Sequence, residues 1–127
     1  MEKDCVTVQI RYHYFHVDQD VRWTGDIMLY DHLVIGRGKQ LLLNQSVNFN
    51  RMYKQRPRTT FMVNESGTIT IEKNARLILD EHSTLVLAGK AKIYLKEGAK
   101  LIVKNGSRII GDSSHIIKAK GAVVVYR

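Results

Sequence analysis

Cysteine, proline and long apolar runs are scarce in this sequence, and each scarcity excludes a class of protein. Cys5 is the only cysteine, so no disulfide framework can form within the chain. One proline and the lack of low-complexity tracts argue against extensive disorder. No stretch approaches the roughly 18 apolar residues of a membrane span. The start, Met1 to Asp4, leads into no signal-peptide apolar region, so we expect either a cytoplasmic chain or a trimmed piece of an exported one.

What the chain does contain is positive charge on an otherwise ordinary composition. Its 127 residues fit one domain, with 44% apolar and 25% charged residues. The formal net charge of +8 favours acidic partners such as nucleic acid, anionic glycans or lipid head groups.

A repeat of apolar doublets runs through the second half of the chain with a step of eight residues. Each doublet reads apolar-x-apolar, a period of two, which indicates a short strand with two side chains on its inner face. This spacing matches no helical stripe, and antiparallel hairpins, the serious rival, usually vary more in length. The doublets are Phe61/Val63, Ile69/Ile71, Leu77/Leu79, Leu85/Leu87, Ile93/Leu95 and Leu101/Val103, and the series continues to Ile109.

Tight corners are predicted between these strands, because a small residue precedes most doublets by two positions. Three eight-residue sides make a coil of about 24 residues, and at that offset Ile69 meets Ile93 and Leu77 meets Leu101. We therefore expect an all-β fold, a right-handed parallel β-helix whose stacked coils bury a continuous apolar column. The small residues are Gly67, Ala75, Ser83, Ala91, Ala99 and Ser107.

The flanking segments follow the pattern less strictly. Residues 1–22 are predicted to form an N-terminal capping or edge strand, and residues 23–127 the β-helix, with a basic loop inserted at 50–60. Before residue 61 the steps between doublets are six, eight and six residues, so we expect two shorter sides there. Near the C-terminus Ile117 keeps the step, and Val123/Val125 follow with the register shifted by two. The early doublets are Ile27/Leu29, Leu33/Ile35, Leu41/Leu43 and Val47/Phe49.

Three stretches of the sequence resemble a known repeat style. They are Trp23-Thr-Gly-Asp-Ile, Leu33-Val-Ile-Gly-Arg-Gly and Gly98-Ala-Lys-Leu-Ile-Val-Lys-Asn-Gly-Ser. Together they look like the β-helix stretches of large surface proteins of Bacteroidetes, over roughly residues 21 to 111. The resemblance implies an extracellular or cell-surface location, since many such proteins are exported; a cytoplasmic location is the alternative.

Two groups of cations are candidates for binding anionic polymers. The insertion carries four cations in eight residues, which suits phosphates or acidic sugars. In the C-terminal half, stacking would align cations into ladders, for example Arg76 beside Lys100. Aromatic residues do not interleave with that half's cations, so we do not expect a single-stranded nucleic acid platform. The predicted polyanion-binding residues are Arg51, Lys54, Arg56, Arg58, Lys92 and Lys100.

Outward-facing apolar residues mark candidate interfaces. The middle residue of each doublet should face outward, and on two sides of the coil it is apolar, which is unusual for an exposed surface. Ile78 and Ile102 share one such side, and Val86 and Ile110 the other. We expect these rows to contact another copy, another domain or further β-helix coils of a longer chain, or the N-terminal strand.

No metal, cofactor or catalytic site is predicted. His13, His16, Asp18 and Asp20 are close in sequence, but on a strand the two histidines point to opposite faces. No pair of acids falls at a coil-related offset that would suggest polysaccharide cleavage. The acids considered are Asp26, Asp31, Asp80, Glu81 and Asp112.

The sequence therefore predicts a non-enzymatic structural, spacer or adhesion-type module. One alternative is a carbohydrate-binding or carbohydrate-active β-helix that uses acids and aromatics near Trp23 and Tyr53. A second alternative is a self-assembling scaffold similar to bactofilins, although their repeat spacing is not matched here.

Overall fold

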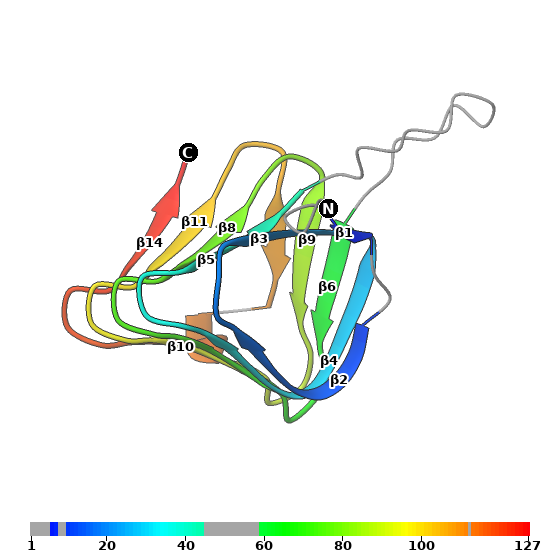
Figure 1. Ribbon diagram of the computed structural model, residues 1–127, viewed down its shortest axis with the longest axis horizontal. Coiled ribbons are helices and arrows are strands. Elements are labelled where there is room, and N and C mark those ends of the chain that lie inside the picture. The colour runs from blue at the N-terminus through cyan, green and yellow to red at the C-terminus, as the bar shows by residue number, and fades with distance from the viewer. Residues whose placement is uncertain (1–5, 8–9, 45–58, 112) are drawn as a thin grey trace.

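Two sheets of parallel strands make up the structure, a computed structural model that describes residues 6–7, 10–44, 59–111 and 113–127 (Figure 1). These ranges contain no α-helix, only a short 3-10 helix, η1 (Ser113–His115). In spatial order the first sheet contains β1 (Val6–Thr7), β3 (Val21–Thr24), β5 (Gln40–Leu43), β8 (Arg76–Leu79), β11 (Lys100–Val103) and β14 (Val123–Tyr126).

The second sheet is strongly curled around its long strand β4 (Asp26–Ile35). The first half of β4 pairs with β6 and the second half with β7, so the sheet divides into two columns of strands. β2 (Ile10–Val17) pairs along β4 on its other side. One column continues through β6 (Thr59–Val63), β9 (Ser83–Leu87) and β12 (Arg108–Ile110), and the other through β7 (Thr68–Ile71), β10 (Lys92–Leu95) and β13 (Ile116–Lys118).

The predicted register of 24 residues is confirmed in the regular part of the chain. Ile93 pairs with Ile69, and Leu101 pairs with Leu77, in parallel ladders. From β6 onward, successive strands visit the three columns in turn. Because the doublets repeat at this interval, each inner side chain lies on an equivalent one from the neighbouring strand.

The apolar core lies where the sequence pattern placed it. Both members of most doublets from Phe61 to Val103 are buried, and they form one cluster with the earlier Leu33, Ile35, Leu41 and Leu43. Burying each such side chain contributes about 1.5–3 kcal/mol. The N-terminal end of the core is aromatic, with the Trp23 ring 5.1 Å from Phe15 and 6.2 Å from Phe61 between centroids.

The predicted corners are tight hydrogen-bonded turns. In each, the small residue donates its backbone N–H to the carbonyl three positions earlier, as Ala75 does to Glu72 at 2.9 Å and Ala99 to Lys96 at 3.0 Å. At four of these corners the residue before the small one has a positive φ: 60° at Asn74 and at His82, 72° at Gly98 and 87° at Gly106. Asn and Gly tolerate this backbone conformation well, which suits them to these positions. Ala75, Ser83, Ala91 and Ala99 are buried at these corners.

Three expectations about the first half of the chain are corrected or left outside the described residues. Of the two shorter sides expected before residue 61, the one from Ile27/Leu29 to Leu33/Ile35 belongs to one continuous strand, β4, whose two halves pair with β6 and β7. Thr59 and Thr60 belong to β6, so the predicted insertion overlaps a strand at its end. The doublet Val47/Phe49 lies outside the described residues.

The predicted register at the C-terminus is wrong by one residue. Ile116, and not Ile117, pairs with Ile93, and Val124 pairs with Leu101. The intervals in these two pairs are therefore 23 residues, because η1 carries the chain from β12 to β13 in a shorter path. Ile117 consequently faces outward and is 44% exposed.

Candidate functional site

A corner with a high density of cations is the most strongly charged feature of the described structure. It comprises the turns that lead from β4, β7, β10 and β13 into the next strand of the first sheet, nested side by side at the left of Figure 1. We call the seven cations of these turns and of the first residues of β8 and β11 the basic corner. They are Arg37, Lys39, Lys73, Arg76, Lys96, Lys100 and Lys120, and all are exposed.

Backbone hydrogen bonds hold the turns of the basic corner in register. Gly38 donates to the Lys73 carbonyl at 3.0 Å, and Asn74 donates to the Glu97 carbonyl at 3.2 Å. Arg76 pairs with Lys100 in the ladder. The cations are therefore arranged in four successive rungs about 4.8 Å apart, a ridge about 14 Å long.

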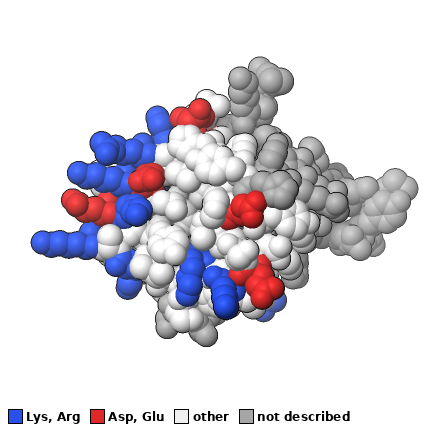
Figure 2. Space-filling view, turned by 90° about the horizontal axis from the view of Figure 1, so that it is seen from below, with Lys and Arg blue, Asp and Glu red and all other residues white. Residues whose placement is uncertain are grey.

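Few acids offset this charge. Glu72 and Glu97 are the only carboxylates on the four turns, so these turns and the first residues of β8 and β11 carry seven cations and two anions, a net charge of +5. Two further acids, Asp18 and Asp20, lie on the neighbouring turn after β2, where Asp20 Oδ1 accepts a hydrogen bond from the Gln40 N–H. The whole chain carries +8. Figure 2 shows many Lys and Arg side chains at this end of the molecule, with acidic side chains among them. The ridge is thus a concentrated positive field along one edge of the molecule.

The predicted polyanion-binding residues are only partly brought together. Lys100, at the start of β11, lies in the basic corner. Lys92 lies outside it, at the start of β10 in the second sheet, where its Nζ donates to the Ser114 carbonyl at 3.1 Å. Arg51, Lys54, Arg56 and Arg58 lie outside the described residues. Sequence reasoning missed Arg37 and Lys39, because the insertion stretches their offset to 36 residues. Arg37 and Lys39 flank Gly38, and a glycine at that place indicates a corner like those at Asn74 and Gly98. This signal could have placed both cations at the corner.

The predicted interface residues differ in exposure. Ile78 and Val86 are half-buried, and Ile110 is 48% exposed. Ile102 is only 5% exposed, so its predicted place on an open surface is wrong. Ile102 pairs with Ile78 on one side and Val125 on the other, so it lies inside its row and not at an edge.

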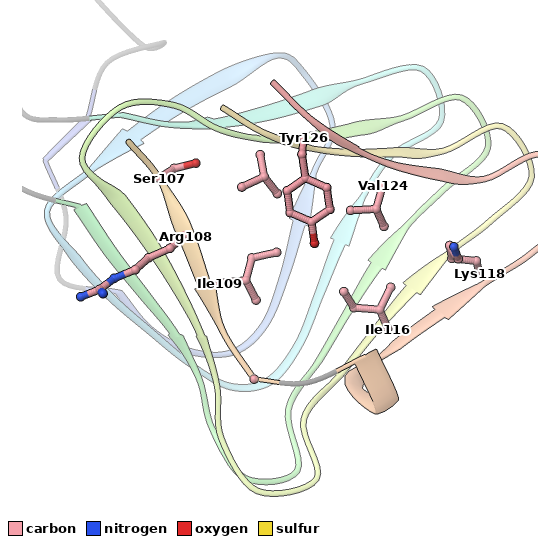
Figure 3. A pocket seen from close by; sticks show the side chains of 9 residues that line it. Ser107, Arg108, Ile109, Ile116, Lys118, Val124 and Tyr126 are labelled. Atoms are coloured by element: carbon pink, nitrogen blue, oxygen red, sulfur yellow. The ribbon is translucent and has the colours of Figure 1, made fainter. Parts of the chain in front are cut away.

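A second feature is an apolar hollow at the C-terminal end, about 580 Å³ in volume. Its apolar lining comes from the last inner side chains, Val103, Ile109, Ile116 and Val124 (Figure 3). The regular doublet pattern stops there. Lys118 takes the position next to Leu95, and Tyr126 the position next to Val103. The hollow therefore lies at the end of the apolar column that the described residues form.

The carbohydrate-platform residues and the metal cluster can be placed only in part. Trp23 is 4% exposed and packed between Phe15 and Phe61, so it presents no ring face to a sugar. Tyr53 lies outside the described residues. Within the described part of the chain, no group of three or more His, Cys, Asp or Glu side chains is arranged to hold a metal ion.

Comparisons with known proteins give no relative from which a role could be transferred. No protein-family model, curated protein or solved structure matches the chain. Among the described residues, no helix has the length and apolar character to cross a membrane.

Proposed function

We propose that the chain is a right-handed parallel β-helix acting as a non-enzymatic spacer or adhesion module, and that its basic corner binds a linear anionic polymer, most simply an acidic glycan. The observation that carries this proposal is the alignment of seven exposed cations in four hydrogen-bonded rungs. Two observations support the β-helix: the 24-residue register, and the way in which successive strands from β6 onward belong to the three columns in turn.

The geometry of the ridge suits an extended polymer better than a small ligand. A small anion is usually held in an enclosed site by converging donors, whereas these side chains line a convex edge. A polymer can contact several rungs at once, and each contact releases counterions from it. Five of the seven cations are lysines, which act as flexible point charges and favour charge density over fixed geometry.

An acidic glycan is favoured over nucleic acid by what the corner lacks. None of its seven cations is accompanied by an aromatic residue on the same turns, so bases would find no stacking surface there. The likeness of the repeat to surface proteins of Bacteroidetes supports an extracellular or cell-surface setting, where acidic polysaccharides are the available polymers.

The test is binding to heparin and to polygalacturonate at several salt concentrations. We expect the logarithm of the binding constant to fall linearly with the logarithm of the salt concentration, and neutral dextran not to bind. Replacing Lys73, Lys96 and Lys100 together by Gln should weaken binding by about tenfold or more.

A matched control separates the corner from general charge. Lys90, Lys92 and Lys104 lie outside the basic corner, and replacing all three by Gln removes the same net charge. We expect this variant to retain most of the binding. Equal losses in the two triple variants would refute a corner-specific site, and binding without salt dependence would refute an electrostatic one.

A further inference from the structure

The exposed large apolar side chains are confined to the two ends of the strand stack. Ile110, Ile117, Val123 and Tyr126 lie on β12, β13 and β14, and Tyr14 lies on β2. Among the residues whose side-chain exposure is described (14–25, 27–44, 59–111 and 114–127), no other large apolar side chain reaches this degree of exposure. Exposed apolar side chains gathered on the terminal strands of the stack mark a candidate contact surface.

The same strands are the edges of the two sheets. Among the described residues, β1 and β14 end the first sheet, β12 and β13 end the second, and β2 pairs with β4 alone. Such edge strands present unpaired backbone N–H and C=O groups that can accept another strand. At the C-terminal edge this backbone surrounds the hollow of about 580 Å³ at the end of the apolar column.

The two edges match each other column by column. β14 and β1 belong to the same sheet, β12 shares a column with the first half of β2, and β13 shares one with its second half. A second copy displaced along the stack would therefore place each C-terminal edge strand beside a parallel edge strand of its own column.

Charge is complementary at the corner where this contact would form. The turn after β2 lies next to the first turn of the basic corner, since Gly36 donates to the Val17 carbonyl at 2.8 Å and Gln40 donates to Asp20 Oδ1 at 3.1 Å. The turn after β2 carries the exposed acids Asp18 and Asp20. The opposite end of the same corner carries the exposed cations Lys118 and Lys120.

We propose that a second copy of this chain docks its N-terminal edge on the C-terminal edge of the first, in a head-to-tail stack with Asp18 and Asp20 facing Lys118 and Lys120. The contact would cover the apolar hollow and pair the edge strands of all three columns. Because such a heterologous contact repeats, it generates open assemblies rather than closed dimers. The proposal goes beyond polymer binding and does not depend on it.

Sedimentation velocity of the full chain across a range of concentrations tests the contact. We expect species larger than a dimer to grow with concentration. Lys118→Glu with Lys120→Glu should raise the apparent dissociation constant about tenfold, because two attractive contacts become repulsive. Asp18→Lys should have an effect of the same sign.

Controls distinguish head-to-tail stacking from other contacts. Lys73→Glu with Lys96→Glu changes net charge equally in the middle of the basic corner, and should weaken heparin binding while leaving assembly nearly intact. Combining Asp18→Lys and Asp20→Lys with Lys118→Glu and Lys120→Glu in one chain should restore assembly.

Three results would each overturn the proposal. The first is a monomer at every concentration, which would assign the edges to a different polypeptide. The second is equal loss of assembly from the end and middle lysine pairs. The third is sensitivity to Lys118 and Lys120 without sensitivity to Asp18, which would indicate tail-to-tail contact.

Discussion

Arg76 and Lys100 are Cα partners on adjacent parallel strands, so two like charges lie directly beside each other on the outer face of the first sheet. Like charges in this position weaken strand pairing. The arrangement is therefore not explained by stability, and it is the kind of local conflict expected where a surface is used for binding.

Replacing Arg76 by Glu should separate stability from binding. The new carboxylate would attract Lys100, so we expect the free energy of unfolding to rise by about 0.2–1 kcal/mol in urea titrations. Heparin affinity should fall, because the basic corner loses one cation and gains an anion. Arg76→Gln only removes the repulsion, so its free energy of unfolding and its heparin affinity should both lie between those of the wild type and of Arg76→Glu. A variant that lost stability and kept its affinity would contradict the assigned role.

Gly98→Ala should destabilise the chain more than Gly38→Ala. Both glycines have a φ of 72°, so each substitution carries the same backbone cost of about 1–2 kcal/mol. An added Cβ at Gly98 would also clash with Asn74 Oδ1, whereas at Gly38 it would meet nothing within 4 Å. Thermal and urea denaturation would measure the difference. Asn74→Gly should rescue Gly98→Ala in a double-mutant cycle, and absence of coupling would argue against the nested turns.

Ile116→Asp and Ile117→Asp test the register of the last strands. Ile116 is half-buried, packs against the core and pairs with Ile93, whereas Ile117 is 44% exposed. We expect Ile116→Asp to cost about 1–3 kcal/mol through burial of a polar group, and Ile117→Asp to change stability by less than about 0.5 kcal/mol. Urea titrations give both values. If Ile117→Asp were the more destabilising of the two, residue 117 would be the buried one, as the strict step of eight residues predicts.

The fluorescence of Trp23 should report a buried ring. It is the only tryptophan, and it packs between Phe15 and Phe61 with 4% exposure. We expect blue-shifted emission that acrylamide quenches weakly, and strong quenching after unfolding in urea. Neutral oligosaccharides should leave the spectrum unchanged. A sugar-dependent shift would favour the alternative in which Trp23 contributes to a carbohydrate site.

The amino-acid sequence determined the regular part of this protein. The period of two within each doublet and the step of eight between doublets predicted Ile93 beside Ile69 and Leu101 beside Leu77. Buried small residues at the corners, such as Ala75 and Ala99, were predicted for the same reason. A strict repeat carries this information because every unit forms the same strand and turn and buries side chains at the same positions.

Only the tertiary structure decided where the repeat is interrupted and which cations come together in the basic corner. The insertion separates Leu41 from Leu77 by 36 residues, and η1 shortens the interval before Ile116 to 23, so no fixed period could align these segments. Arg37 and Lys39 therefore lie near Lys73 and Arg76 because their turns pack side by side. The spacing of these residues in the sequence does not predict this proximity. Exposure also depends on neighbours in space, which is why Ile102 is covered while Ile110, at an edge, is open.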